Sequence, residues 1–132
     1  MTPQASSSAA SQPTYVEEPA FYVFTFSLTA FQAVQQVPVN IDRDSDFLLT
    51  GLNGESTGQY TLNFRLPSGR LVASSQMFAA DLIGTANQPT AIGPPPIYRA
   101  GSSGPQVDLT DTSGLPNTVI IIFSGIRRIR TT

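Results

Sequence analysis

The chain has 132 residues, the size of one ordinary domain, and a formal net charge of −2. It contains no Cys and no His, which excludes disulfides, metal sites built on those side chains and histidine-dependent catalytic triads. All 7 basic residues are Arg and only 12% of the residues are charged, so the chain lacks the basic excess of a typical nucleic-acid-binding protein.

Ser, Thr, Asn and Gln take the place of the missing charges. A neutral polar surface loses little solvation free energy when another protein covers it. This composition favours a subunit that is buried in an assembly, and the alternative is an ordinary soluble domain from a genome with an Arg bias. No apolar stretch is long enough to span a membrane and residues 1–13 do not have the regions of a signal peptide, so we expect a soluble protein made in the cytoplasm.

Residues 1–20 are predicted to form a flexible N-terminal arm, followed by one β-sandwich domain over residues 21–132. The arm is rich in Ser, Ala and Pro, which bury too little apolar surface to offset the loss of chain entropy. Tyr15 and Val16 are its apolar residues and are candidates for binding a partner. The alternative is a tail without function.

From Phe21 onward apolar and polar residues alternate, which is typical of a half-buried strand. This pattern places Tyr22, Phe24, Phe26 and Leu28 on one face. Further strands are predicted at 37–41, 47–50, 59–66, 71–73, 97–99, 106–109 and 118–123. Pro38 places its strand at a sheet edge, and Pro67-Ser68-Gly69 predicts a hairpin turn. A short helix fits within 29–37 or 74–82.

The last predicted strand is apolar on both faces, so we expect it to be central and covered on both sides, with a bend or bulge at Gly125. The predicted core contains Phe24, Phe26, Leu62, Phe64, Ile120 and Ile122. Together these features predict an all-β fold, an antiparallel β-sandwich and possibly a jelly roll, with no helix longer than about three turns.

Asp42, Asp44 and Asp46 resemble the start of a calcium-binding loop, but Phe47 replaces its Gly and Asn53 replaces its bidentate Glu. We therefore predict a charged turn and no metal. Asp108 and Asp111 are a possible acid–base pair, although carboxylates beside a turn usually bind backbone groups. Without His or Lys no common base is present to activate Ser, so the sequence predicts no catalytic site and no cofactor.

Arg127, Arg128 and Arg130 form a basic cluster near the C-terminus and are further candidates for binding a partner. The cluster fits an acidic protein surface or the phosphates of packaged DNA. The alternative is an edge strand that its charges protect from pairing.

From Phe21 onward several features follow one another in a characteristic order. They are a Gln-rich stretch after the first strand (31–35), an acidic turn entering an apolar strand (39–47), a strand that ends at 67–71, a Pro-rich stretch, Ala100-Gly101-Ser102, Val107–Asp111, and the closing segment Asn117–Arg127. In this order they resemble small β-sandwich virion proteins of tailed bacteriophages, which cement or decorate heads or sit at necks and vertices.

The resemblance implies a non-enzymatic structural protein located in the virion that binds the major capsid protein or other virion proteins. It also implies a homo-oligomer, with a trimer favoured, and neither membrane binding nor specific nucleic-acid binding. A neck, collar, vertex or baseplate component is the alternative within this class. A carbohydrate- or ligand-binding β-sandwich is the alternative from another class, which the absence of Trp makes less favourable.

Overall fold

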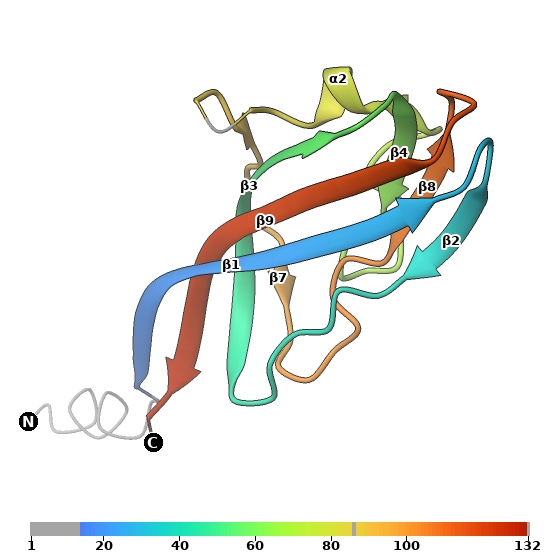
Figure 1. Ribbon diagram of the computed structural model, residues 1–132. Coiled ribbons are helices and arrows are strands. Elements are labelled where there is room, and N and C mark those ends of the chain that lie inside the picture. The colour runs from blue at the N-terminus through green and yellow to red at the C-terminus, as the bar shows by residue number, and fades with distance from the viewer. Residues whose placement is uncertain (1–13, 86, 132) are drawn as a thin grey trace, which may run out of the picture.

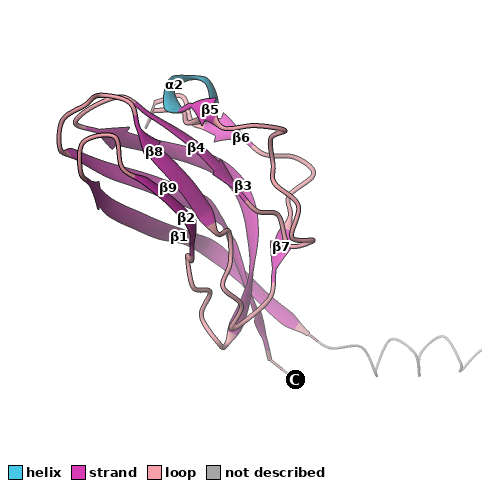
Figure 2. Cartoon of the chain, turned by 90° about the vertical axis from the view of Figure 1, so that its right-hand side faces the viewer, coloured by secondary structure: helices cyan, strands magenta, loops and turns pink. Residues whose placement is uncertain are grey.

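In the computed structural model, which describes residues 14–85 and 87–131, two antiparallel sheets pack face to face (Figures 1 and 2). The first sheet has the order β1 (Tyr15–Leu28), β9 (Asn117–Arg130), β3 (Ser45–Ser56) and β6 (Thr90–Ala91), and β7 (Ile97–Tyr98) also pairs with β3. The second has the order β2 (Ala33–Val37), β8 (Val107–Asp111), β4 (Tyr60–Phe64) and β5 (Met77–Phe78). The predicted all-β antiparallel sandwich is confirmed.

The strand order is that of a jelly roll. The outermost strands in sequence pair with each other, β1 with β9, and the pairs then nest inward as β2 with β8, β3 with β6, and β4 with β5. A nested antiparallel ribbon that wraps into two sheets in this way is the double Greek key of the jelly roll. The predicted helix within 74–82 is the one-turn helix α2 (Ala79–Leu82), at one end of the sandwich (Figure 1).

Strand β1 begins at Tyr15, so the prediction of a flexible arm that reaches residue 20 is wrong. Residues 15–20 pair with β9 from Tyr15 opposite Arg130 to Ala20 opposite Gly125. The local sequence gave no reason to expect this, because the segment is ordered by a ladder to a strand more than a hundred residues away. Residues 1–13 of the predicted arm lie outside the described residues.

The segment after β1 also differs from the prediction. A turn closed by the Gln32 N–H and the Thr29 carbonyl (3.0 Å) leads into β2, so the helix that fitted within 29–37 is not formed. Strand β2 ends at Val37 and is an edge strand, and the predicted strand at 37–41 is instead an extended loop with buried Val39 and Ile41. Positive φ angles at Phe31 and Gln36 break the regular strand geometry here.

Strand β9 is central, as predicted, with β1 on one side and β3 on the other (Figure 1). The predicted irregularity at Gly125 is a bulge in the opposite strand, because the β3–β9 register shifts between Leu49 and Gly51. A Cβ on Gly125 would collide with the Leu48 carbonyl oxygen. Only Gly therefore lets β3 approach β9 this closely.

The bulge also explains the burial pattern of β3. Leu49 and Leu52 are both buried although they are three positions apart, which an uninterrupted strand would not allow. The extra residue at this point turns the strand so that its apolar side chains on both sides of the bulge face the second sheet.

Three of the six predicted core residues, Phe24, Leu62 and Phe64, are buried, and Phe26 is only partly buried, although it packs against the core. The prediction that Ile120 and Ile122 lie in the core is wrong, because both are half-buried. The β9 residues in the core are Val119, Ile121 and Phe123. In a strand that is apolar on both faces, only the register decides which face is inward. Here buried Phe24 lies opposite Ile121, which fixes the odd-numbered residues of β9 inside.

Phe64→Ala should destabilise the fold by about 3–5 kcal/mol, because Phe64 is fully buried and meets Phe123 edge to face at 5.9 Å. Phe78→Ala is the matched control, since that ring is 54% exposed, and should change stability by about 0.5 kcal/mol or less. Chemical denaturation measures both. Equal costs for the two variants would contradict the core assignment.

Gly125→Ala should cost about 1–3 kcal/mol, because the added methyl group forces β3 away from β9. Gly93→Ala is the control, because a Cβ there meets no atom within 4 Å. The melting temperatures of the two variants, measured by thermal denaturation, test this expectation. An unchanged melting temperature for Gly125→Ala would show that the two strands are not in close contact at this point.

Candidate functional site

The predicted partner-binding residues lie where the N-terminal half of β1 pairs with the C-terminal half of β9. Glu17 lies opposite Arg128 and Glu18 opposite Arg127, and each pair forms an ion pair at 3.0 Å. Because successive residues point to opposite faces, the two ion pairs lie on opposite sides of the sheet. Cross-strand pairs of opposite charge stabilise the ladder at this end.

Arg127 lies on the inner face, where it also approaches the Asp42 carboxylate at 3.6 Å. The hydrogen bond that it donates to Glu18 raises the pKa of its guanidinium, against burial, which lowers it. Its Nε atom is buried and has no hydrogen-bond partner in the described part of the chain. These contacts give Arg127 a structural role between β1, β9 and the loop that precedes β3.

Arg128 lies on the outer face, with its guanidinium 5.4 Å from the centre of the Tyr15 ring. Arg130 lies opposite Tyr15 and Val16 opposite Ile129. The structure therefore brings Tyr15, Arg128 and Arg130 together on one face. The edge-strand interpretation of the basic cluster is wrong, because β9 lies between β1 and β3.

The acidic residues suspected of metal binding or catalysis have structural partners. Asp46 accepts a hydrogen bond from the Ala100 N–H (2.9 Å), and Asp44 accepts one from the Ser45 hydroxyl (3.1 Å). Asp108 pairs with Arg65 (3.1 Å) and accepts the Gln36 N–H (2.8 Å). Within residues 14–85 and 87–131 no group of three or more acidic side chains is placed to hold a metal ion.

Asp111 is buried and accepts five hydrogen bonds at the junction of three chain segments. Its carboxylate receives the N–H groups of Phe31, Ser113 and Gly114, the Ser113 hydroxyl and the Asn117 amide, at 2.7–3.2 Å. Burial alone would raise the pKa of Asp111, but these hydrogen bonds outweigh it and hold the pKa well below its usual range. As the sequence suggested, the carboxylate serves backbone groups, and it joins the β1–β2 turn to the β8–β9 turn.

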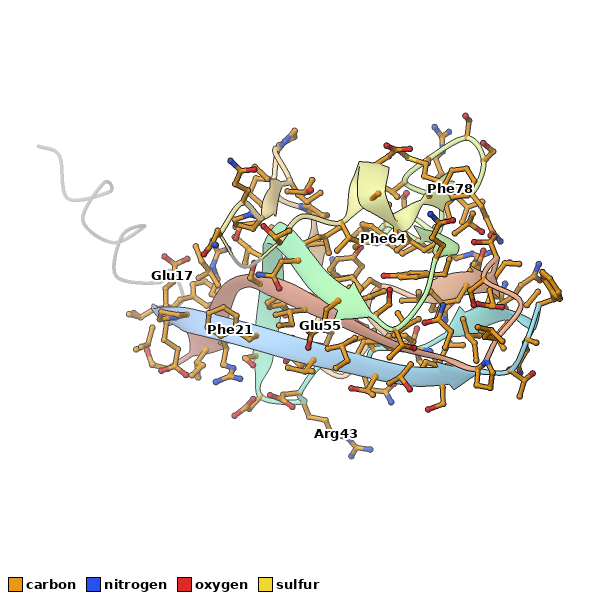
Figure 3. All side chains as sticks on the ribbon, turned by 45° about the horizontal axis from the view of Figure 1, so that its top comes forward. Glu17, Phe21, Arg43, Glu55, Phe64 and Phe78 are labelled. Atoms are coloured by element: carbon orange, nitrogen blue, oxygen red, sulfur yellow. The ribbon has the colours of Figure 1, made fainter. Side chains whose placement is uncertain are left out.

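The outer face of the first sheet carries an apolar patch that the sequence analysis missed. Phe21 and Val23 of β1 are 64% and 62% exposed, and the half-buried Ile120 and Ile122 of β9 lie beside them, since Val23 pairs with Ile122. Figure 3 shows Phe21 on β1, far from Phe78 beside α2. We call Phe21, Val23, Ile120 and Ile122 the outer patch. The sequence did contain a signal for this patch, because Phe21 and Val23, on either side of the predicted inward residue Tyr22, are also apolar.

A cleft of about 680 Å³ opens at the end of the sandwich near α2. The end of β3, the β3–β4 turn and the α2 segment line it, with Glu55, Gln59, Phe78 and Asp81 among its residues. Its volume lies in the range of small-molecule sites. No Arg is among the residues that line it.

No protein-family model, no curated protein and no solved structure matches the chain. None of the helices in the described residues is both long and apolar enough to cross a membrane.

Asp111→Asn should lower the melting temperature at pH 7, because an amide NH₂ then faces N–H donors that the carboxylate accepted. The folded-state pKa of Asp111 is below its unfolded value of about 3.9, so the carboxylate stabilises the fold above that pH. This contribution is lost as the pH falls below about 4.

Melting temperatures from pH 7 to pH 2 test the linkage. The gap between the wild type and Asp111→Asn should narrow in acid, whereas the exposed Asp81→Asn control should follow the wild type throughout. Parallel curves for the wild type and Asp111→Asn would contradict the lowered pKa.

Proposed function

We propose that the chain is a non-enzymatic structural protein of a tailed-phage virion, which cements or decorates the head by binding between capsid subunits. The observation that carries the proposal is the outer patch on a sheet face with few charges. An exposed apolar surface of this kind is typical of protein–protein contact sites. The ordered resemblance to small virion proteins and the jelly-roll strand order, which is found in viral capsid proteins, support the same role as analogies.

The charge distribution also supports packing against protein. Residues 21–28 contain no charged side chain, and the nearest acids of β1, Glu17 and Glu18, are neutralised by Arg128 and Arg127. Glu55 of β3 lies opposite Ile120 and is a charge beside the patch, so covering this face strips water from that carboxylate but from few other charges. The same ion pairs argue against binding to packaged DNA, since phosphates would compete with carboxylates already bound to Arg127 and Arg128.

The N-terminal arm is part of the proposal in a shortened form. Because residues 15–20 belong to β1, an arm that contacts a neighbouring subunit is confined to residues 1–13. Deletion of residues 2–13 leaves intact every strand that the structure describes, whereas a deletion that extends into β1 removes part of the β1–β9 ladder. We expect this truncated protein to keep its melting temperature and to occupy particles less completely.

A neck, collar, vertex or baseplate position remains the alternative within the virion, because the same face would serve there. The cleft favours a second function, the binding of a carbohydrate or another small ligand. Phe78 offers an exposed ring, and Glu55 and Asp81 offer hydrogen-bond acceptors for hydroxyl groups. Jelly rolls also occur in lectins. A glycan array with the wild type and Phe78→Ala distinguishes this function, because only a ligand in the cleft requires that ring.

A cryo-EM map of the virion encoded by the same genome tests the proposed function, with density for this sandwich expected on the head between capsid subunits. Absence of the chain from purified particles would contradict it.

Val23→Glu should abolish binding of the recombinant protein to particles that lack it, because it places a charge at the centre of the outer patch. Leu115→Glu is the matched control, since Leu115 is similarly exposed but lies in the β8–β9 turn. Co-sedimentation with particles measures both variants. Equal binding of the two variants would show that the contact with the particle lies on another surface of the protein.

A further inference from the structure

The open edge of β1 is the starting point for an inference about how copies of this chain associate. Strand β1 has 14 residues and, among residues 14–85 and 87–131, pairs only with β9, so its other side is an edge of the described sheet. The other sheet edges are formed by short strands: β2 has 5 residues, and β5, β6 and β7 have 2 residues each. Short edge strands resist pairing with another chain, and a long one invites it.

The hydrogen-bond phase of β1 shows which residues face this edge. The Thr131 N–H donates to the Thr14 carbonyl (2.9 Å), so Thr14 faces β9. The β1–β9 register is continuous, so the even-numbered residues from 16 to 28 also face β9. The odd-numbered residues from 15 to 27 direct their N–H and C=O groups toward the open edge.

Two features limit the usable part of this edge. Pro19 is one of the odd-numbered residues that face the edge, and it has no N–H to donate. At the other end, the Thr29 N–H already donates to the Gln32 side-chain oxygen (2.9 Å). Between these positions, the edge-facing N–H and C=O groups of Phe21, Val23, Thr25 and Ser27 have no strand partner in the described part of the chain, and the centre of this segment is Phe24.

We propose that two copies of the chain pair through this edge, antiparallel, about a twofold axis at Phe24. Phe21 then faces Ser27 of the other copy, and Val23 faces Thr25. Each of these pairs exchanges two backbone hydrogen bonds, so the interface contains about eight. Pro19 faces Thr29, so the two positions without a free N–H lie opposite each other.

The side chains support a second copy as the occupant. Large Phe21 meets small Ser27 on the outer face, and Val23 and Thr25 form a β-branched cross-strand pair. No charge lies within the paired segment, and Glu17 and Glu18 fall beyond its end. An axis at Val23 would place Pro19, which has no N–H, opposite Ser27 of the other copy. An axis at Thr25 would place Thr29, whose N–H is already bonded, opposite Phe21.

This dimer does not depend on the virion role, because it is a property of the isolated chain. It closes after two copies, in contrast to the trimer that the resemblance favours. It also places the two outer patches on the same face of one continuous sheet, where a third protein can cover both.

The oligomeric state of the full chain is the first test. Analytical ultracentrifugation should show a dimer for the wild type and for Thr25→Val, and a monomer for Thr25→Pro. The proline removes an N–H that faces the edge and none that faces β9, so Thr25→Pro should keep a β-sheet far-UV spectrum. A wild type that is monomeric or trimeric at every concentration would overturn the inference.

Engineered cysteines test the register independently of any destabilisation by proline, since the chain has no natural Cys. Cα atoms of directly paired residues lie about 5.5 Å apart, within disulfide range, and diagonal ones about 7–8 Å apart, outside it. An equimolar mixture of Val23→Cys and Thr25→Cys chains should therefore form mixed disulfide dimers under mild oxidation, and Val23→Cys alone should not. Self-crosslinking of Val23→Cys without mixed dimers would overturn the Phe24 axis.

Discussion

The pairing of β9 on both of its sides is the constraint on which the rest of the sandwich depends. Its ladder to β1 orders residues 15–20, which have no local reason to form a strand, and its ladder to β3 requires Gly125. The same strand supplies Val119, Ile121 and Phe123 to the core and the two isoleucines of the outer patch. One strand thus determines the inner packing and the outward face, which couples the stability of the fold to the surface that we propose for assembly.

Asp111 is a second constraint, and it acts on topology. A buried carboxylate that accepts three backbone N–H groups, a hydroxyl and an amide can be satisfied only if the β1–β2 and β8–β9 turns meet. These turns connect the two sheets at one end of the sandwich, because β1 and β9 belong to one sheet and β2 and β8 to the other. The polar network therefore fixes which strands cross between the sheets, and the apolar core fixes how the sheets pack.

The sequence alone predicted the fold class, the central position of the last strand, the turn at residues 67–69 and an irregularity at Gly125, although not that the bulge lies in the opposite strand, because each of these depends on a local pattern or on a special residue. The 67–69 turn is closed by the Gly69 N–H and the Leu66 carbonyl, with a positive φ at Gly69. The start of β1, the inward face of β9 and the ion pairs of Arg127 and Arg128 were missed, because register joins residues that are distant in the chain. The outer patch was missed for the same reason: Phe21 and Ile122 become neighbours only after β1 and β9 pair.

The outer patch and the open edge of β1 have a common physical origin. A strand that is apolar on both faces needs cover on both, and the second sheet covers only the inner one, which leaves Ile120 and Ile122 half-buried beside Phe21 and Val23. An uncharged, aromatic-rich edge strand is also an aggregation hazard when it is left unpaired. Pro19 and the Thr29–Gln32 turn limit how far a partner strand can extend along it, so the segment between them favours one defined pairing over open-ended association. A surface with these properties fits the place in an assembly that we propose for the chain.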